Sequence, residues 1–239
     1  MSGHSKWATT KRAKAVTDAK RSAVFTKVAN LITIAARDKG GDINTNFALR
    51  IAVEKGRAAN MPKDNIERAI KRGTGELGGE AIEELIYEGI GPVNSQFIIK
   101  CLTDSKNRTA SNIRHIFSKF GGSMAAVGWN FEQKGVIRIA KDNMGTTNID
   151  ELELELIDAG ADDIIKEDEG ITIYTKTGDL QTVKIFFDNK KIEVESAEIE
   201  YVAKEEQVLT EEEKTKVENF IEALEENEDV NDYYTNVII

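Results

Sequence analysis

The spacing of apolar residues changes near residue 75, and this change limits the folds open to the chain. Before it, apolar side chains recur every three or four residues, as at Phe25, Val28, Ala29 and Ile32, which is the spacing of one helix face. After it, short strand-like runs alternate with helical ones. The sequence therefore predicts a helical N-terminal region followed by mixed α and β structure.

Three helices are predicted in the first region. The first ends at Gly40-Gly41, the second covers about 46–59, and the third runs from Met61-Pro62 to Gly73. Proline suits the start of the third helix, because its missing N–H costs nothing in a first turn. The expected inward-facing residues of the second and third helices are Phe47, Ile51, Ala58, Ile66, Ala69 and Ile70.

The second region is predicted to contain strands and helices in two sets. Strands are expected near 84–90, 95–102, 123–131, 135–140, 163–167, 170–175, 192–202 and 230–239, and helices near 108–119, 149–159, 179–189 and 210–226. The segment 151–156 alternates Glu and Leu and also fits a strand. A helix is favoured there because Asn148 can cap it, Glu151 completes a capping box and Gly160 stops it.

Counting these elements predicts how the chain is divided into domains. The second set is a complete βαββαβ unit, whereas the first lacks a closing helix and strand that the C-terminal segment would supply. We therefore expect an α+β protein with a helical domain over 1–75 and two α/β domains of ferredoxin-like type. The second domain is discontinuous, over 76–131 and 206–239, and the third, over 132–205, is inserted into it. The glycine-rich run 73–79 is interpreted as a linker, since no strand precedes it and no Gly-Lys-Ser/Thr follows.

The charge of the chain is divided as sharply as its periodicity. Residues 1–75 carry 16 basic and 6 acidic side chains, a net charge of +10, whereas residues 76–239 carry 16 basic and 36 acidic ones, a net charge of −20. A small module with such an excess of Lys and Arg attracts polyanions. We expect nucleic acid to bind the helical domain and to be repelled by the acidic domains.

Specific basic residues are candidates for this contact. Arg68 and Arg72 lie four apart on one face of the third helix, with Lys71 close by and the Ile66 and Ile70 stripe roughly opposite. Trp7 would either stack on a base or anchor the N-terminal arm, and both interpretations stay open. A solvated basic surface is the alternative for the whole set. The predicted contact residues are Lys6, Trp7, Lys11, Arg12, Lys14, Lys20, Arg21, Lys63, Arg68, Lys71 and Arg72.

Few residues suggest catalysis or a cofactor. Neither His4 nor His115 has Cys or carboxylate partners at ligand spacing, so no metal site is expected. Cys101 lies in an apolar run and is interpreted as a buried structural thiol. With no membrane-length apolar run and no secretory signal, we expect a cytoplasmic protein that is not an enzyme, with no cofactor and no small-molecule substrate.

Several motifs resemble those of the YebC/PmpR family, which includes the mitochondrial translational activator of cytochrome c oxidase. They are Gly3-His4-Ser5-Lys6-Trp7, Asn60-Met61-Pro62-Lys63-Asp64-Asn65-Ile66-Glu67-Arg68, Tyr87-Glu88-Gly89, Leu102-Thr103-Asp104-Ser105-Lys106-Asn107-Arg108-Thr109 and Asn227-Glu228-Asp229-Val230. The chain departs from the family at Thr9-Thr10 and at Trp129-Asn130-Phe131. The resemblance implies a helical domain and two α/β domains in a non-enzymatic regulator of gene expression.

Two functions follow from the resemblance together with the basic module. The first is DNA-binding transcriptional regulation by a bacterial, cytoplasmic protein. The alternative is a ribosome-associated factor that contacts rRNA or tRNA and assists synthesis of proline-rich segments. The helical segments show no helix-turn-helix signature with an obvious recognition helix, which weakens sequence-specific DNA reading. Nucleic acid, either DNA or ribosomal RNA, is the expected partner in both cases, with the ribosome added in the second.

Overall fold

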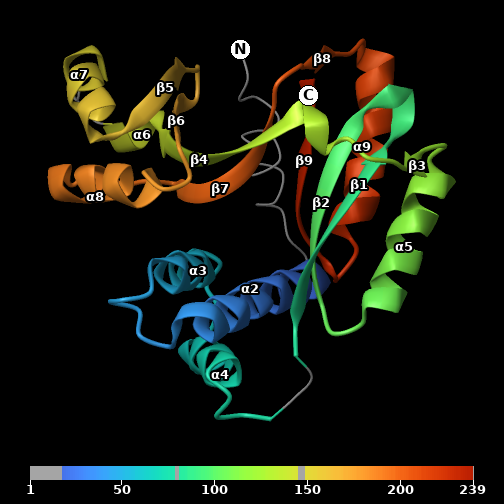
Figure 1. Ribbon diagram of the computed structural model, residues 1–239, viewed down its shortest axis with the longest axis horizontal. Coiled ribbons are helices and arrows are strands. Elements are labelled where there is room, and N and C mark those ends of the chain that lie inside the picture. The colour runs from blue at the N-terminus through green and yellow to red at the C-terminus, as the bar shows by residue number, and fades with distance from the viewer. Residues whose placement is uncertain (1–17, 79–80, 145–148, 239) are drawn as a thin grey trace. The chain divides into compact units, whose positions relative to one another are not determined.

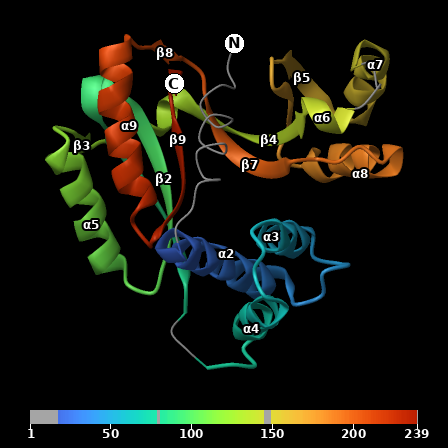
Figure 2. The same ribbon diagram turned by 180° about the vertical axis from the view of Figure 1, so that it is seen from behind.

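The computed structural model describes residues 18–78, 81–144 and 149–238, and for 18–22 and 149–151 it describes the backbone alone (Figures 1 and 2). The chain divides into two units. One comprises the described residues up to Val127 together with Leu209–Thr235, and the other comprises 128–208 with the end of the chain from Asn236. The helical region therefore belongs to the same unit as the first sheet. The division of the chain into three domains stays a prediction.

Three helices form the described part of the helical region, from residue 18 on, as the periodicity predicts. They are α2 (Asp18–Lys39), α3 (Phe47–Ala58) and α4 (Lys63–Gly73). Helix α2 packs against both α3 and α4. The shared core includes Val28, Ile32, Leu49, Val53 and Ile66, all nearly or fully buried. The long helix α2 is thus the support on which the two shorter helices are positioned (Figure 1).

The predicted inward face of α3 is wrong. Phe47 and Ile51 are half-buried and Ala58 is exposed, whereas the buried residues are Leu49, Ala52, Val53 and Gly56. The reason is Asn46, whose side chain accepts a hydrogen bond from the Leu49 N–H at 3.0 Å and donates to the Ala35 and Gly40 carbonyls at 2.7 Å each. These bonds set the rotation of α3 about its axis. The stripe on α4 is correct for Ile66 and Ala69, while Ile70 is half-buried.

The first sheet contains strands from both chain segments of its unit. Its order is β3-β1-β2-β9, all antiparallel, and β9 is Val230–Thr235, near the end of the chain. The other strands are β1 (Glu83–Ile90), β2 (Gln96–Thr103) and β3 (Ser123–Met124). Helices α5 (Lys106–Lys119) and α9 (Glu211–Glu225) lie side by side on one face (Figures 1 and 2). Three aromatic rings meet there: the centroid of Phe220 lies 4.8 Å from that of Phe97 and 5.1 Å from that of Phe117.

The predicted strand 123–131 is much shorter in the structure. Only β3 pairs with β1, and the segment then leaves the ladder because the Val127 N–H donates to the Glu88 carboxylate at 2.7 Å. A 3-10 turn follows over Gly128–Asn130, and Phe131 begins the next sheet. The last strand is also interrupted, since β9 ends at Thr235 and Val237–Ile238 (β10) pairs in parallel with Gln207–Val208 (β8).

The second sheet belongs to the inserted segment. Its antiparallel order is β5-β6-β4-β7. The strands are β4 (Phe131–Ala140), β5 (Ala161–Lys166), β6 (Gly170–Thr175) and β7 (Ser196–Ala203), and the helices are α6 (Lys141–Met144), α7 (Ile149–Ala159) and α8 (Leu180–Lys190). Strand β7 begins later than the predicted residue 192, because Lys191 adopts a left-handed conformation and the Ile192 N–H still bonds the Phe187 carbonyl. The fold class is confirmed: a helical N-terminal region precedes two antiparallel α/β parts, one inserted into the other.

Candidate nucleic-acid interface

The side chains of seven predicted contact residues lie outside the described part of the structure. Lys6, Trp7, Lys11, Arg12 and Lys14 lie outside the described residues, and Lys20 and Arg21 lie in α2 where only the backbone is described. These seven stay predictions. The other four, Lys63, Arg68, Lys71 and Arg72, all lie on α4.

Helix α4 is held against α2 by its inner side. Ile66 and Ala69 are buried there, and the Thr33 hydroxyl of α2 donates to the Ala69 carbonyl at 3.2 Å. Gly73 approaches α2 so closely that a Cβ atom at this position would lie 2.3 Å from the Thr33 carbonyl oxygen. The outer side of α4 therefore has a defined orientation in its unit.

Three of the four cations come together on that outer side. Arg68 and Lys71 are exposed and Arg72 is half-buried. Residues three and four apart are neighbours on a helix surface, so the three form one basic face away from Ile66. Lys63 lies at the opposite end of α4, where its Nζ is 3.5 Å from Glu67 Oε1. We call Arg68, Lys71 and Arg72 the α4 basic face.

Two nearby residues were missed by the sequence reasoning. Asp64 is exposed and lies four residues before Arg68, so it reduces the local positive charge of the α4 basic face. Arg57 is exposed in the last turn of α3 and adds a cation to the helical region. The sequence contained a signal for Arg57, because it is one of the 16 basic residues counted in residues 1–75.

Two cations attach the helical region to the first sheet. Lys27 of α2 donates to the Glu225 carbonyl at the end of α9, with a 2.7 Å separation, and Arg37 donates to the Ile82 carbonyl at 2.5 Å. Burial lowers the pKa of Lys27, an effect that the charges of Glu225 and Asp232 oppose. Helix α2, and α4 packed upon it, is thereby held on the sheet of its unit.

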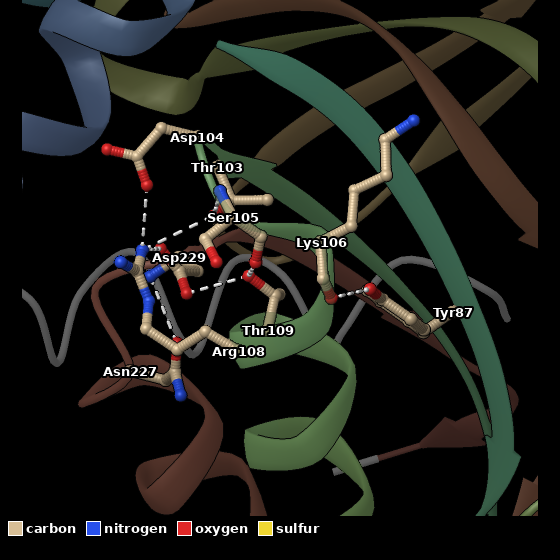
Figure 3. Close-up of polar contacts among 9 residues, drawn as sticks. All are labelled: Tyr87, Thr103, Asp104, Ser105, Lys106, Arg108, Thr109, Asn227 and Asp229. Atoms are coloured by element: carbon tan, nitrogen blue, oxygen red, sulfur yellow. Dashed lines mark hydrogen bonds and ion pairs between the residues drawn. The ribbon is translucent and has the colours of Figure 1, made fainter. Parts of the chain in front are cut away.

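A polar network surrounds the start of α5, as Figure 3 shows. Arg108 Nη2 lies 2.9 Å from Asp229 Oδ1, 3.1 Å from Asp104 Oδ1 and 3.3 Å from Thr103 Oγ1. The buried Thr109 hydroxyl donates to Asp229 Oδ2 at 2.8 Å. The hydrogen bond from Arg108 to Asp229 and the charge of Asp229 raise the pKa of Arg108. The carboxylate of Asp229 is thus satisfied on both oxygens.

Backbone groups complete this network. The Ser105 N–H donates to Thr103 Oγ1 at 2.9 Å, the Asp229 N–H to the Asn227 side chain at 3.0 Å, and the Leu102 N–H to the Asp229 carbonyl at 2.8 Å. The Tyr87 hydroxyl reaches the Lys106 carbonyl at 3.4 Å (Figure 3). These contacts join the end of β2 and the start of α5 to the turn before β9. The two motifs around residues 102–109 and 227–230 therefore connect distant parts of the chain.

Groups that could support other chemistry are few among the described residues. His115 is exposed, and no cluster of three or more His, Cys, Asp or Glu side chains in the described part could hold a metal ion. Cys101 is fully buried, as predicted, and burial raises its pKa to about 12. No described helix has both the length and the apolar character that crossing a membrane requires.

Comparisons with known proteins agree with the resemblance seen in the motifs. Residues 5–76 match the model of the TACO1/YebC protein N-terminal domain, and residues 82–237 match that of the TACO1/YebC second and third domain. A "probable transcriptional regulatory protein" of Thermoanaerobacter pseudethanolicus is 48% identical, covering 100% of this chain and 98% of the relative. A protein of Thermotoga maritima with the same description is also 48% identical, over 99% of this chain and 93% of the relative.

A solved structure agrees with the fold. The crystal structure of a conserved hypothetical protein from Aquifex aeolicus superposes with a TM-score of 0.82 at 37% identity. The match covers 93% of this chain and 92% of that one. The family models, the relatives and the shared fold together establish that this chain belongs to the TACO1/YebC family.

Proposed function

We propose that the protein regulates gene expression by binding nucleic acid through its helical region, as a DNA-binding transcriptional regulator. The observation that carries the proposal is the α4 basic face, which points away from the core that α4 shares with α2. The description of the relatives as transcriptional regulatory proteins supports the same function. We place its action in the cytoplasm and expect no catalysis.

The helix dipole of α4 explains the presence of some, but not all, of the cations in the α4 basic face. Lys71 and Arg72 lie in the last turn of α4, where cations interact favourably with the helix dipole. Arg68 lies before the last turn, so the dipole does not account for it. Cations held three and four residues apart repel one another, and the phosphates of a nucleic acid would offset that repulsion.

A second candidate function follows from the chemistry of the same face. Contacts to phosphate position a protein without reading bases, and phosphates are common to DNA and RNA. A ribosome-associated factor that contacts rRNA or tRNA would use the α4 basic face in the same way. Crosslinking in living cells, followed by sequencing of the bound nucleic acid, separates the two: promoter fragments would favour transcription and ribosomal RNA would favour translation.

Replacing Arg68, Lys71 and Arg72 together by Ala tests the binding surface. The fold should persist, because Ala is a good helix former and the buried side of α4 is unchanged. Affinity of the full-length protein for duplex DNA and for a structured RNA should fall. The slope of log K against log salt should decrease by roughly 0.7–0.9 for each phosphate that the variant no longer neutralises.

A matched control removes three exposed cations from elsewhere, by changing Arg114, Lys141 and Lys176 to Ala. Both triple variants alter the net charge by the same amount, so only the loss specific to α4 reports on the contact. Wild-type affinity and salt slope in a folded α4 variant would exclude this face and leave the N-terminal arm as the candidate. Hydrolysis of DNA, RNA or nucleoside triphosphates by the purified protein with Mg²⁺ would contradict the absence of catalysis.

A further inference from the structure

The outer side of α7 exposes two large apolar side chains. Leu154 is 76% exposed and Ile157 is 54% exposed. Leu152 and Leu156, from the same short run, are 7% and 0% exposed. Single exposed apolar residues are common on protein surfaces, but two on one side of a short helix form a small apolar patch.

The alternating sequence of α7 explains this exposure. In a strand, the leucines at 152, 154 and 156 would share one face, but the segment folds as a helix. Leu152 and Leu156 are four apart and face inward together, whereas Leu154 lies two residues from each and faces outward. Ile157 follows Leu154 by three residues and lies beside it. Among the described side chains of α7, Leu152 and Leu156 are the buried ones.

Acidic residues surround this patch. Helix α7 contains five acidic residues and no Lys or Arg in its sequence IDELELELIDA. Glu153 and Asp158 are exposed beside Leu154 and Ile157, and Asp162 is exposed in β5, the strand that follows. Glu155 is paired with Lys190 of α8, Nζ to Oε2 2.8 Å. Residues 128–208 as a whole carry 9 basic and 20 acidic side chains, a net charge of −11.

We propose that the outer side of α7, formed by Leu154 and Ile157 with Glu153 and Asp158, docks a basic amphipathic segment of another protein. A partner that offers apolar side chains between Lys and Arg would cover the patch and pair with the acidic residues around it. An apolar centre with a charged border is the usual composition of a protein interface. Nucleic acid and anionic lipid surfaces are repelled by the same acidic residues, so a protein partner is the occupant that the charge favours.

The size of the patch sets the character of the contact. Two partly exposed side chains support only a small interface, of the kind that is weak and transient. The charged border makes association fast and dependent on salt. This proposal uses only residues between 128 and 208, so it is independent of the α4 basic face.

The test uses the full-length protein and a labelled synthetic probe. The probe is an 18-residue peptide of Lys and Leu with its leucines on one helix face, and fluorescence anisotropy measures its binding. Leu154→Gln with Ile157→Gln should weaken binding by about tenfold or more, because a few central apolar residues carry most of the affinity of an interface. Ile199→Gln with Val208→Gln, which change exposed apolar residues of the same unit, should weaken binding less than twofold. Glu153→Gln with Asp158→Asn should reduce the dependence of binding on salt.

Several results would overturn the proposal. One is the absence of binding to the wild-type protein, and another is equal loss in the two apolar double variants. Equal binding of a peptide with the same composition but scattered leucines would remove the amphipathic requirement. A change of sedimentation coefficient in the Leu154 and Ile157 variant would instead assign the patch to contacts between copies of this chain. DNA affinity, measured in the same variant, should be unchanged, which keeps this test separate from the proposed function.

Discussion

Gly73, the last residue of α4, is a position where the usual preference of a helix for alanine should be reversed. A Cβ atom there would lie 2.3 Å from the Thr33 carbonyl oxygen, 2.7 Å from Ala36 Cβ and 3.1 Å from the Arg37 backbone nitrogen. Backbone atoms of α2 cannot rotate away as a long side chain can. Gly73→Ala would therefore force α4 away from α2.

The expected magnitude is the difference between two opposing effects. Helix propensity alone favours Ala over Gly by about 1 kcal/mol in a helix interior, and by less at a helix end. Overpacking a tight contact costs about 1–3 kcal/mol and more when the backbone itself must move. We expect Gly73→Ala to destabilise the helical region by about 1–2 kcal/mol.

Gly56 of α3 provides a matched control in the same helical region. A Cβ atom at Gly56 would meet Val28 Cγ1 at 3.4 Å, Ile66 Cδ1 at 3.6 Å and Ile32 Cδ1 at 3.7 Å, which are ordinary contacts. Gly56→Ala should therefore be neutral or stabilise the region by up to about 1 kcal/mol.

Hydrogen exchange of peptides from α2, α3 and α4 is the appropriate assay. The chain has two units, so a single global unfolding curve can mix their transitions, whereas exchange reports local opening. Protection should fall in Gly73→Ala and should not fall in Gly56→Ala. Protection in Gly73→Ala equal to or above that of the wild type would refute the packing argument, and so would equal destabilisation by both substitutions.

Three further outcomes are expected. The buried guanidinium of Arg138 lies 2.6 Å and 3.0 Å from the Glu200 carboxylate oxygens. Glu200→Gln removes the charge of this paired carboxylate, so it should destabilise the second sheet by about 3 kcal/mol, seen as faster hydrogen exchange in β4 and β7. Cys101 should resist a thiol reagent at pH 8 until urea unfolds the protein, since burial raises its pKa to about 12; stoichiometric labelling of the native protein would contradict this. The hydrogen bonds from Thr210 lower the pKa of Glu213, so its stabilisation of α9 is present above the ordinary carboxyl range and is lost as the pH falls through the lowered value. Protection factors in the first turn of α9, which compare exchange with its intrinsic rate at each pH, should fall there in the wild type and change less in Glu213→Gln.

Features that depend on neighbouring residues could be predicted from the order of the amino acids alone. Apolar spacing predicts α2, α3 and α4, and the capping box between Thr210 and Glu213 at the start of α9 involves residues only three apart. The α4 basic face also followed from spacing alone, because residues three and four apart on a helix meet whatever the rest of the chain does. The division of charge at residue 75 is likewise a property of composition.

Features that join distant residues became visible only in the folded chain. The hydrogen bonds from Asn46 to the Ala35 and Gly40 carbonyls determine which side of α3 faces inward. The hydrogen bond from the Val127 N–H to Glu88 ends the pairing of this segment with the first sheet. Asp229 meets Thr109, 120 residues away, in a contact that no local pattern contains. Local propensity favours a class of structure over a few residues, but the rotation of a helix, the length of a strand and the burial of a carboxylate depend on packing against parts of the chain that the fold brings together.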